Sequence, residues 1–347
     1  MRHRLLSRVA ERIYWLGRYM ERADNTARLI SVNANMLMDM PGRVALGWRP
    51  LIDITGSEAL FDLLYGESSE RNVCRFLTCD ARHSSAITSA ISAARENART
   101  VRETMPGPTF EHVNDLHLFA HAALGPNLSR IKRHAALEGI SSRVQRLEGF
   151  LSQNMLHGAP WQLLRLGSRI ERADMTTRII DVRSNDLLPP GLDLAPFREI
   201  QWRSVLGSLN ARQSYQGIVG APVTRPLVLE FLFREPGLPR SYAYCLNAIR
   251  RHIRSLPRHE APLRACDQAA GFLASSDLGT LDRDSLHRFL DECQVQLGQL
   301  HESITETWFR VPEDTVQPAP AQGEMPFGNN GFAPREATLP KPEGSPR

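Results

Sequence analysis

The sequence predicts an all-α protein: an internally duplicated helical bundle with pseudo-twofold symmetry and a disordered C-terminal tail. Three observations predict this fold class. A fifteen-residue segment recurs 150 positions further along the chain, the apolar residues follow the helical period instead of the alternation of a strand, and the composition changes after Arg310.

The repeated segment is the most informative feature of the chain. Residues 16–30 read LGRYMERADNTARLI and residues 166–180 read LGSRIERADMTTRII, with nine of the fifteen positions identical. Weaker matches continue downstream, where Trp48 aligns with Trp202 at an offset of 154 and Val73 aligns with Val228 at an offset of 155. Because the offset stays nearly constant, the pattern indicates duplication of a whole unit. We therefore expect one helical domain over 1–310, made of two repeats at about 1–157 and 158–310.

Periodicity and proline positions place the individual helices. The first long helix is expected from Ser7 to Met40, because Pro41 would break it. Its counterpart is expected to begin near Pro160, which suits a first helical turn, and to end before Pro189. The short segments 73–77 and 228–232 are each predicted to start a helix. Longer helices are expected over 84–105, 110–124 and 241–256.

The C-terminal segment 311–347 has a different character. Of its last 36 residues, 8 are proline and 4 are glycine, and no hydrophobic period survives. Such a segment buries too little apolar surface to offset the entropy of ordering it. We expect it to be disordered.

Composition and charge exclude several functional classes. Lys+Arg number 42 against 38 Asp+Glu, so the net charge of +4 argues against a nucleic-acid-binding tail. There is no apolar run of about 18 residues to span a membrane, and 1–24 has no apolar signal-peptide region. The five cysteines are scattered and form no CxxC pair, which argues against a disulfide framework or a zinc site. We expect a cytoplasmic protein without a membrane or nucleic-acid partner.

A cluster of acids and arginines lies on one face of each repeated helix. On a helical wheel Glu21, Asp24 and Arg28 fall together, on the line of the apolar Tyr14 and of Gly17, whose missing side chain permits close approach. Apolar neighbours are unusual for a solvated face, so we expect the cluster to be interior or to line a cleft. The second copy and the flanking residues complete the candidate site: Glu171, Asp174 and Arg178, flanked by Arg18, Arg22, Asn25 and Arg172.

Three interpretations of this cluster remain open. It is a buried ion-pair network, in which an arginine bridges the glutamate at i−7 and the aspartate at i−4. Alternatively, it is a cleft that binds a small anionic or amino ligand. A carboxylate metal site is the third, but the arginines already neutralise the acids and no Glu-x-x-His pair is present. No catalytic residue can be assigned, and we expect neither a metal nor a cofactor.

Other chemical motifs are weak. His117 and His121 have the spacing of a zinc-ligand pair on a helix, but a zinc site would need a third ligand placed by the fold, and two histidines on a mostly polar face are the alternative. Neither a phosphate-binding glycine loop nor a GxSxG nucleophile elbow occurs. Cys74 and Cys79 are interpreted as core filler.

These segments together resemble the alpha-E family, which is named for an α-helical domain with an ER motif. The resemblance extends collinearly over about residues 5–255, and the second copy departs from the first at Ser168, opposite Arg18, and Met175, opposite Asn25. The segments that carry it are Ile13-Tyr14-Trp15-Leu16-Gly17-Arg18, Glu21-Arg22-Ala23-Asp24, Ala94-Arg95-Glu96-Asn97, Glu171-Arg172-Ala173-Asp174 and Leu238-Pro239-Arg240-Ser241.

The resemblance implies a role without assigning catalytic residues. Proteins of this family accompany, or are fused to, circularly permuted ATP-grasp amide ligases and transglutaminase-like proteins. It therefore implies an accessory or recognition component of an ATP-grasp amide-ligase or peptide-tagging system, a component that is not itself an enzyme. An enzyme that acts on peptide or amino-acid products through the ER carboxylates, and a purely structural helical module, are the alternatives.

Overall fold

The computed structural model describes 7–39, 47–184, 195–220 and 222–310, with the backbone alone for 39, 183–184 and 195–198. Within these ranges every regular element is a helix, so the predicted all-α class is confirmed. Residues 1–310 form one compact unit. The predicted disordered tail and the predicted end of the second long helix near Pro189 lie outside the described residues.

The helices follow one another with short connections. Those before residue 158 are α1 (Ser7–Asp39), α2 (Arg49–Thr55), α3 (Glu58–Leu64), α4 (Glu70–Cys79), α5 (Ile87–Thr100), the 3-10 turn Arg102–Thr104, α6 (Thr109–Ala123) and α7 (Arg130–Asn154). Those after it are α8 (Ala159–Ser184), α9 (Ala195–Ser208), α10 (Arg212–Ile218), α11 (Arg225–Arg234), α12 (Tyr242–Arg254), α13 (Glu260–Ser275) and α14 (Arg283–Trp308).

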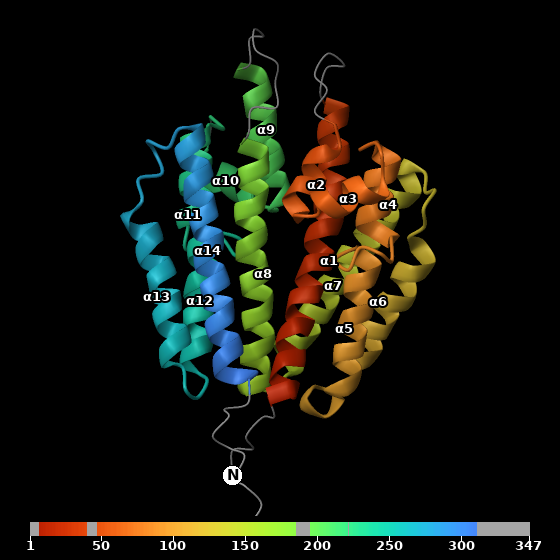
Figure 1. The fold of residues 1–347 in the computed structure, drawn as a ribbon, viewed down its shortest axis with the longest axis vertical. Helices are drawn as coiled ribbons and strands as arrows, with labels where there is room; N and C mark the ends of the chain where they lie inside the picture. The colour runs from red at the N-terminus through yellow and green to blue at the C-terminus, as the bar shows by residue number, and fades with distance from the viewer. Residues whose placement is uncertain (1–6, 40–46, 185–194, 221, 311–347) are drawn as a thin grey trace, which may run out of the picture. The chain divides into compact units, whose positions relative to one another are not determined.

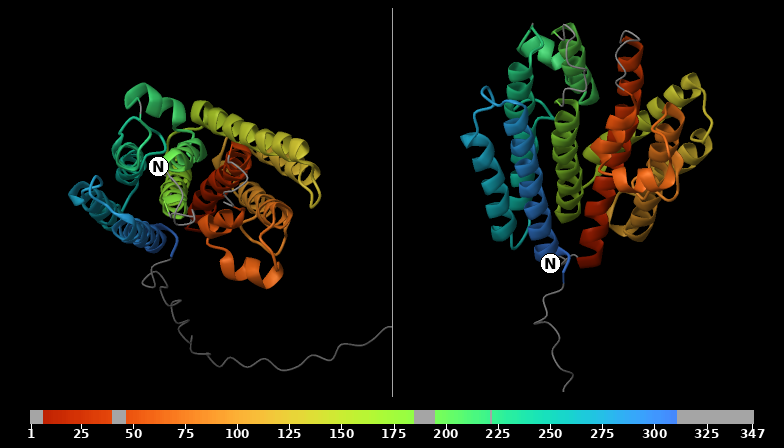
Figure 2. Two further views of the ribbon diagram at one scale, coloured as in Figure 1. Left: turned by 90° about the horizontal axis from the view of Figure 1, so that it is seen from above. Right: turned by 45° about the horizontal axis from the view of Figure 1, so that its top comes forward.

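Two long helices, α1 and α8, form the centre of the unit (Figure 1). They run parallel and lie side by side at the lower end of the view, then separate toward the upper end. Helices α5 and α7 pack against α1, while α12 and α14 pack against α8. Seen from above, α6 and α13 lie outside these neighbours on the two opposite sides (Figure 2). The paired central helices therefore carry the expected polar cluster into the middle of the unit.

The apolar stripe of α1 explains this central place. Ile13, Leu16, Ala23, Ala27 and Ile30 recur at helical spacing and are all buried. Because a helix with a buried polar face as well must be covered on both sides, α1 is surrounded by neighbours, and so is α8.

Two predicted helix boundaries are wrong. The 73–77 and 228–232 segments lie inside α4 and α11, which begin three residues earlier. For α4 the reason is a cap, because the Ser69 side chain accepts a hydrogen bond from the Asn72 backbone N–H. For α11 it is Pro226 in the first turn, where proline is tolerated.

Among the described residues, no helix has both the length and the apolar character to cross a membrane.

Candidate functional site

The two ER pairs exchange partners between the central helices. The Glu21 carboxylate accepts hydrogen bonds from Nε and Nη2 of Arg172 at 2.8 and 2.6 Å. The Glu171 carboxylate accepts them from Nε and Nη2 of Arg22 at 2.6 and 3.0 Å. Each acid therefore holds the planar guanidinium of the opposite helix through two parallel bonds, the geometry that binds a carboxylate most firmly. We call these four residues the ER core.

A further arginine supports each acid of the ER core. Arg18 donates from Nε to Glu171 at 2.7 Å, one helical turn before Arg22. On the other side Arg240, in the connection before α12, donates from Nη1 to Glu21 at 3.2 Å. The same guanidinium donates to Asn25 Oδ1 at 2.7 Å and to Asp24 Oδ2 at 3.1 Å. The side chains of Asn25 and Asp24 are thereby included in the site.

The aspartates are paired within their own helices. Arg28 bonds to Asp24 one turn earlier in α1, and Arg178 donates to Asp174 at 2.9 Å in α8. The expected bridge from one arginine to both acids of its helix is replaced by these pairs, because the glutamates are already held from the opposite helix and from Arg240. We call the whole set the ER cluster. It consists of the ER core, the two aspartate–arginine pairs, Arg18, Asn25 and Arg240.

Burial differs between the two ends of the ER cluster. The side chains of Glu21 and Glu171 are each 3% exposed. The Asp24–Arg28 pair is nearly as well covered, whereas the side chains of Asp174 and Arg178 are 22% and 34% exposed. The two carboxylates of the ER core are therefore interior, whereas Arg22, with a side chain 20% exposed, and the second aspartate pair reach toward the surface.

Electrostatics keep the ER core charged at neutral pH. Burial alone would raise the pKa of Glu171, but Arg18 and Arg22 outweigh it and lower the pKa to about 2. For Glu21 the same balance, with Arg172 and Arg240 as the cations, lowers its pKa as well. Burial opposes the charge of Arg172, and the Glu21 carboxylate raises the pKa of Arg172 above its usual value. Both carboxylates are therefore ionised and occupied.

Glycine allows the central helices to approach each other. A Cβ atom on Gly17 would lie 2.2 Å from the carbonyl oxygen of Leu164, and one on Gly167 would lie 2.0 Å from that of Tyr14. Real Cβ atoms do not approach an oxygen so closely. The close contact that glycine predicts is therefore present in both helices, one turn before the ER core.

Arg169 is a buried cation that the sequence did not single out. It is 6% exposed, and its Nε and Nη1 have no hydrogen-bond partner within the described ranges. Its guanidinium lies 5.7 Å from the centre of the Tyr244 ring, which provides a weaker attraction. Burial first, and then Arg172 and Arg165, lower the pKa of Arg169 to about 10, so it still carries its charge at pH 7.

The other sequence candidates form no comparable site. The rings of His117 and His121 lie 4.4 Å apart, and both approach the Ser92 hydroxyl. Burial raises the pKa of the Cys74 thiol to about 12, so this cysteine is neutral and unreactive. Cys79 packs against the core, as expected.

One group of possible metal ligands occurs within the described ranges. It consists of Asp181, His287 and Asp291. His287 Nδ1 lies 2.7 Å from Asp181, and its Nε2 lies 3.4 Å from Asp291. Of these two contacts the one to Asp181 is a hydrogen bond and the one to Asp291 is an ion-pair distance, and His287 and Asp291 are both exposed.

The ER cluster is better suited to fixing the positions of the helices than to proton transfer or metal binding. A general base needs a carboxylate that is free to accept a proton, and a metal ion needs oxygens that are not already taken by guanidinium groups. Two cavities of the described structure, of about 670 and 370 Å³, are lined by other residues. Sequence reasoning found the acids and most of the arginines, but it missed Arg240 and Arg169. The only signal for Arg240 was its place in the LPRS segment.

Comparison with known proteins identifies the family. Residues 5–309 match the alpha-E family, described as a predicted alpha-helical domain with a conserved ER motif. Uncharacterized proteins of Mycobacterium bovis and of two strains of Mycobacterium tuberculosis are each 22% identical over 326 residues. The match covers 86% of this chain but 36% of each relative, so the chain spans about a third of their length. No solved structure matches the chain. The chain belongs to the alpha-E family.

Proposed function

Since the chain is an alpha-E protein, we propose that it is an accessory or recognition component of an ATP-grasp amide-ligase or peptide-tagging system. Its partners would be a circularly permuted ATP-grasp ligase and a transglutaminase-like protein. The observation that carries this proposal is the length of the relatives, of which the match covers 36%. A helical domain that occurs inside chains about three times as long serves as one module of a larger assembly. Because the proposed ligase partner uses ATP, the same proposal places the chain in the cytoplasm.

Duplication of the helical unit belongs to the same proposal. Seven helices are described before residue 158 and seven after it, and from the third pair onward corresponding helices differ in length by at most one residue. Helices α3 and α10 have 7 residues each, α4 and α11 have 10 each, and α7 and α14 have 25 and 26. The reciprocal pairing of the ER core is what a pseudo-twofold axis between α1 and α8 would produce. We infer that the ER cluster is the polar site at the interface of two repeats.

The role of the ER cluster in this proposal is to fix the geometry of the two halves. Its ionised, fully occupied glutamates support a positioning role over proton transfer or metal binding. The surface end, at Asp174 and Arg178, is the part of the ER cluster that a partner could reach. An enzyme acting through the ER carboxylates and a purely structural module remain the alternatives.

Co-expression of the full chain with the ATP-grasp ligase of the same genome tests the accessory role. The measurements are complex formation by size-exclusion chromatography with light scattering, and ATP turnover by the ligase with and without the chain. We expect a stable complex and faster turnover. Absence of both would reject the accessory role.

Arg178→Ala tests whether the surface end of the ER cluster contributes to recognition. We expect it to weaken the complex by about tenfold, roughly 1.4 kcal/mol. The control is Arg203→Ala, which removes an i,i+4 pair with Glu199 on α9 that is more exposed, at 46% and 45%. Equal affinities for the two variants would remove the surface end of the ER cluster from the recognition site. Stoichiometric Mg, Mn or Zn in the purified protein would instead favour the enzyme alternative.

A further inference from the structure

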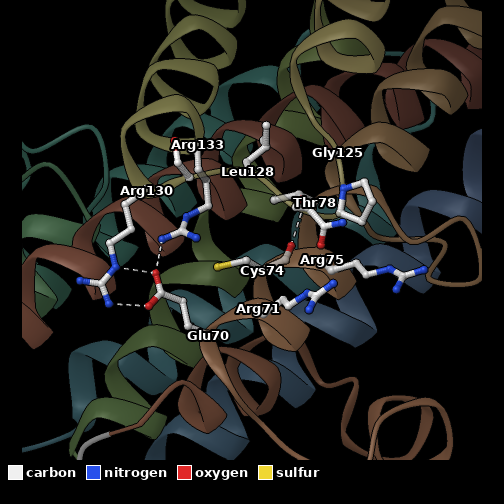
Figure 3. A pocket seen from close by; sticks show the side chains of 12 residues that line it. Glu70, Arg71, Cys74, Arg75, Thr78, Gly125, Leu128, Arg130 and Arg133 are labelled. Atoms are coloured by element: carbon white, nitrogen blue, oxygen red, sulfur yellow. Dashed lines mark hydrogen bonds and ion pairs between the residues drawn. The ribbon is translucent and has the colours of Figure 1, made fainter.

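A cavity lies away from the ER cluster, between α4, the 125–128 connection and the first turn of α7. Its volume is about 670 Å³, within the range of about 300–1,000 Å³ that holds small-molecule ligands. Four of its twelve lining residues are arginines and one is a glutamate: Arg71, Arg75, Arg130, Arg133 and Glu70. We call it the arginine pocket (Figure 3).

The one acid of the arginine pocket is already occupied. Glu70 accepts hydrogen bonds from Nε and Nη2 of Arg130 at 3.0 and 2.6 Å, and it also bonds to Arg133. Arg133 is 7% exposed and lies over the Trp48 ring, so this side chain is fixed in place. Glu70 thus orients the two arginines of α7 and leaves no carboxylate for those of α4.

The two arginines of α4 have no counter-charge of their own. Arg71 and Arg75 are exposed, form no ion pair or hydrogen bond within the described ranges, and extend away from Glu70 in Figure 3. They are separated by one helical turn, a spacing at which like charges repel. A ligand anion between them would remove that repulsion.

The α7 helix begins against its own dipole at the arginine pocket. An acidic residue in the first turn normally stabilises a helix, because the free N–H groups there carry partial positive charge. The first turn of α7 has no acid and contains Arg130, Lys132 and Arg133. The side chain of Ser129 accepts one of the free N–H groups, that of Lys132, at 3.4 Å. Positive charge is therefore concentrated there by the helix and by its side chains together.

The floor of the arginine pocket offers no reactive group. Cys74 and Thr78 line it from α4, both are buried, and the Thr78 hydroxyl donates to the Cys74 carbonyl at 2.7 Å. Since the thiol is neutral at physiological pH, the chemistry of the arginine pocket is binding without reaction.

We propose that the arginine pocket binds the carboxylate or phosphate groups of a small polyanionic ligand. Four guanidinium groups against one carboxylate leave positive charge for more than one acid group, and guanidinium pairs with both oxyanions through planar double hydrogen bonds. This inference rests on the arginine pocket alone and does not require the ATP-grasp association.

Isothermal titration calorimetry of the full chain at low salt tests the proposal, with inorganic phosphate and citrate as separate probes. We expect saturable binding of at least one probe. Phosphate alone would identify a phosphate ligand, citrate alone a carboxylate ligand, and both a shared oxyanion site. If neither probe binds saturably, the proposal is wrong.

The double variant Arg71→Gln, Arg75→Gln should weaken binding by about tenfold or more. The matched control is Arg8→Gln, Arg12→Gln, which removes two exposed arginines of α1 at the same spacing and should change affinity by less than about twofold. Equal losses in the two double variants would mean non-specific attraction, and wild-type affinity in the first would mean another site. Either result overturns the proposal.

Glu70→Gln provides a test that does not remove an arginine. It releases Arg130 and Arg133 from their carboxylate, so we expect tighter binding of the same probe. Unchanged or weaker binding would contradict the proposal. Circular dichroism of each variant verifies that it is folded.

Discussion

The ER cluster and the arginine pocket use the same residue type in opposite ways. In the ER cluster, arginines meet buried carboxylates one to one or two to one, and the glutamates are 3% exposed. In the arginine pocket, two arginines pair with the one carboxylate and the other two have none, beside a cavity of about 670 Å³. Neutralised guanidinium groups in a packed interior fix the position of helices, whereas guanidinium groups without counter-charge beside open space attract a ligand.

The comparison therefore concerns what each arginine does for the fold. Loss of an arginine from the ER core leaves a buried carboxylate without its main partner. Loss of Arg71 or Arg75 from the arginine pocket relieves repulsion instead. Stability measurements should respond in opposite directions in the two regions, and four predictions follow that contrast from the largest effect to the smallest.

Arg172→Ala should have the largest effect on stability. It removes both hydrogen bonds in the ER core from Glu21, which would retain only Arg240, and breaking a buried pair costs about 3–5 kcal/mol. Urea unfolding at pH 7 measures the loss. Arg203→Ala, at a half-exposed pair, is the control and should cost less than about 1 kcal/mol. Similar losses in the two variants would mean that burial does not distinguish the ER core.

Gly17→Ala should be the next most damaging change. The added Cβ would meet the Leu164 carbonyl oxygen at 2.2 Å, so α1 and α8 must separate, at a cost of about 3 kcal/mol. Gly149→Ala on α7 is the matched control, because nothing lies within 4 Å of its added Cβ. Replacing an exposed glycine within a helix should stabilise the protein by about 0.5–1 kcal/mol. A neutral Gly17→Ala would show that the close contact of the helices is not required.

Acid should weaken the ER core within a defined pH range. The pKa of Glu171 is lowered from its ordinary 4.5 to about 2 in the folded chain. Its contribution is therefore complete above pH 4.5 and is lost as the pH falls toward 2, by about 2–3 kcal/mol. Unfolding free energies between pH 6 and pH 2 test this. Glu171→Gln should show a smaller decrease over that range, and an equal decrease would assign the acid sensitivity to other carboxylates.

The arginine pocket should give the smallest effect, with the opposite sign. Arg71→Gln, Arg75→Gln removes a repulsive pair at i,i+4, so the protein without ligand should gain about 0.2–0.5 kcal/mol. Thermal unfolding in phosphate-free buffer at low salt is sensitive to this difference. A clear loss of stability would mean that these arginines support the fold, as those of the ER core do.

Much of the fold could be predicted from the sequence because its signals are local. Hydrophobic period and proline placed α1 and the start of α8, and the missing alternation of apolar and polar residues argued against strands. Gly17 and its repeat Gly167 indicated a close contact between helices. Glycine within a helix lowers its stability, and close packing of a neighbour is the reason for it here. Boundaries that depend on a cap, such as the start of α4, were less visible.

The pairing within the ER cluster could not be predicted from one helix. A helical wheel groups Glu21 with Asp24 and Arg28, and it turns Arg22 to the side. Arg22 bonds to Glu171 because α8 lies on that side, which a wheel cannot show. Arg240 is 219 positions from Glu21 in the chain. The arginine pocket is equally non-local, because it forms only where α4 and α7 meet.

The central claim is that the buried ion pairs of the ER core hold α1 and α8 together. A double-mutant cycle on Glu21 and Arg172 tests it most directly. The cycle compares Glu21→Gln, Arg172→Gln and the double variant by urea unfolding at pH 7. We predict a coupling free energy of about 2–3 kcal/mol, against less than about 0.5 kcal/mol for the same cycle on Glu199 and Arg203. Coupling within about 0.5 kcal/mol of zero for Glu21 and Arg172 would contradict the account.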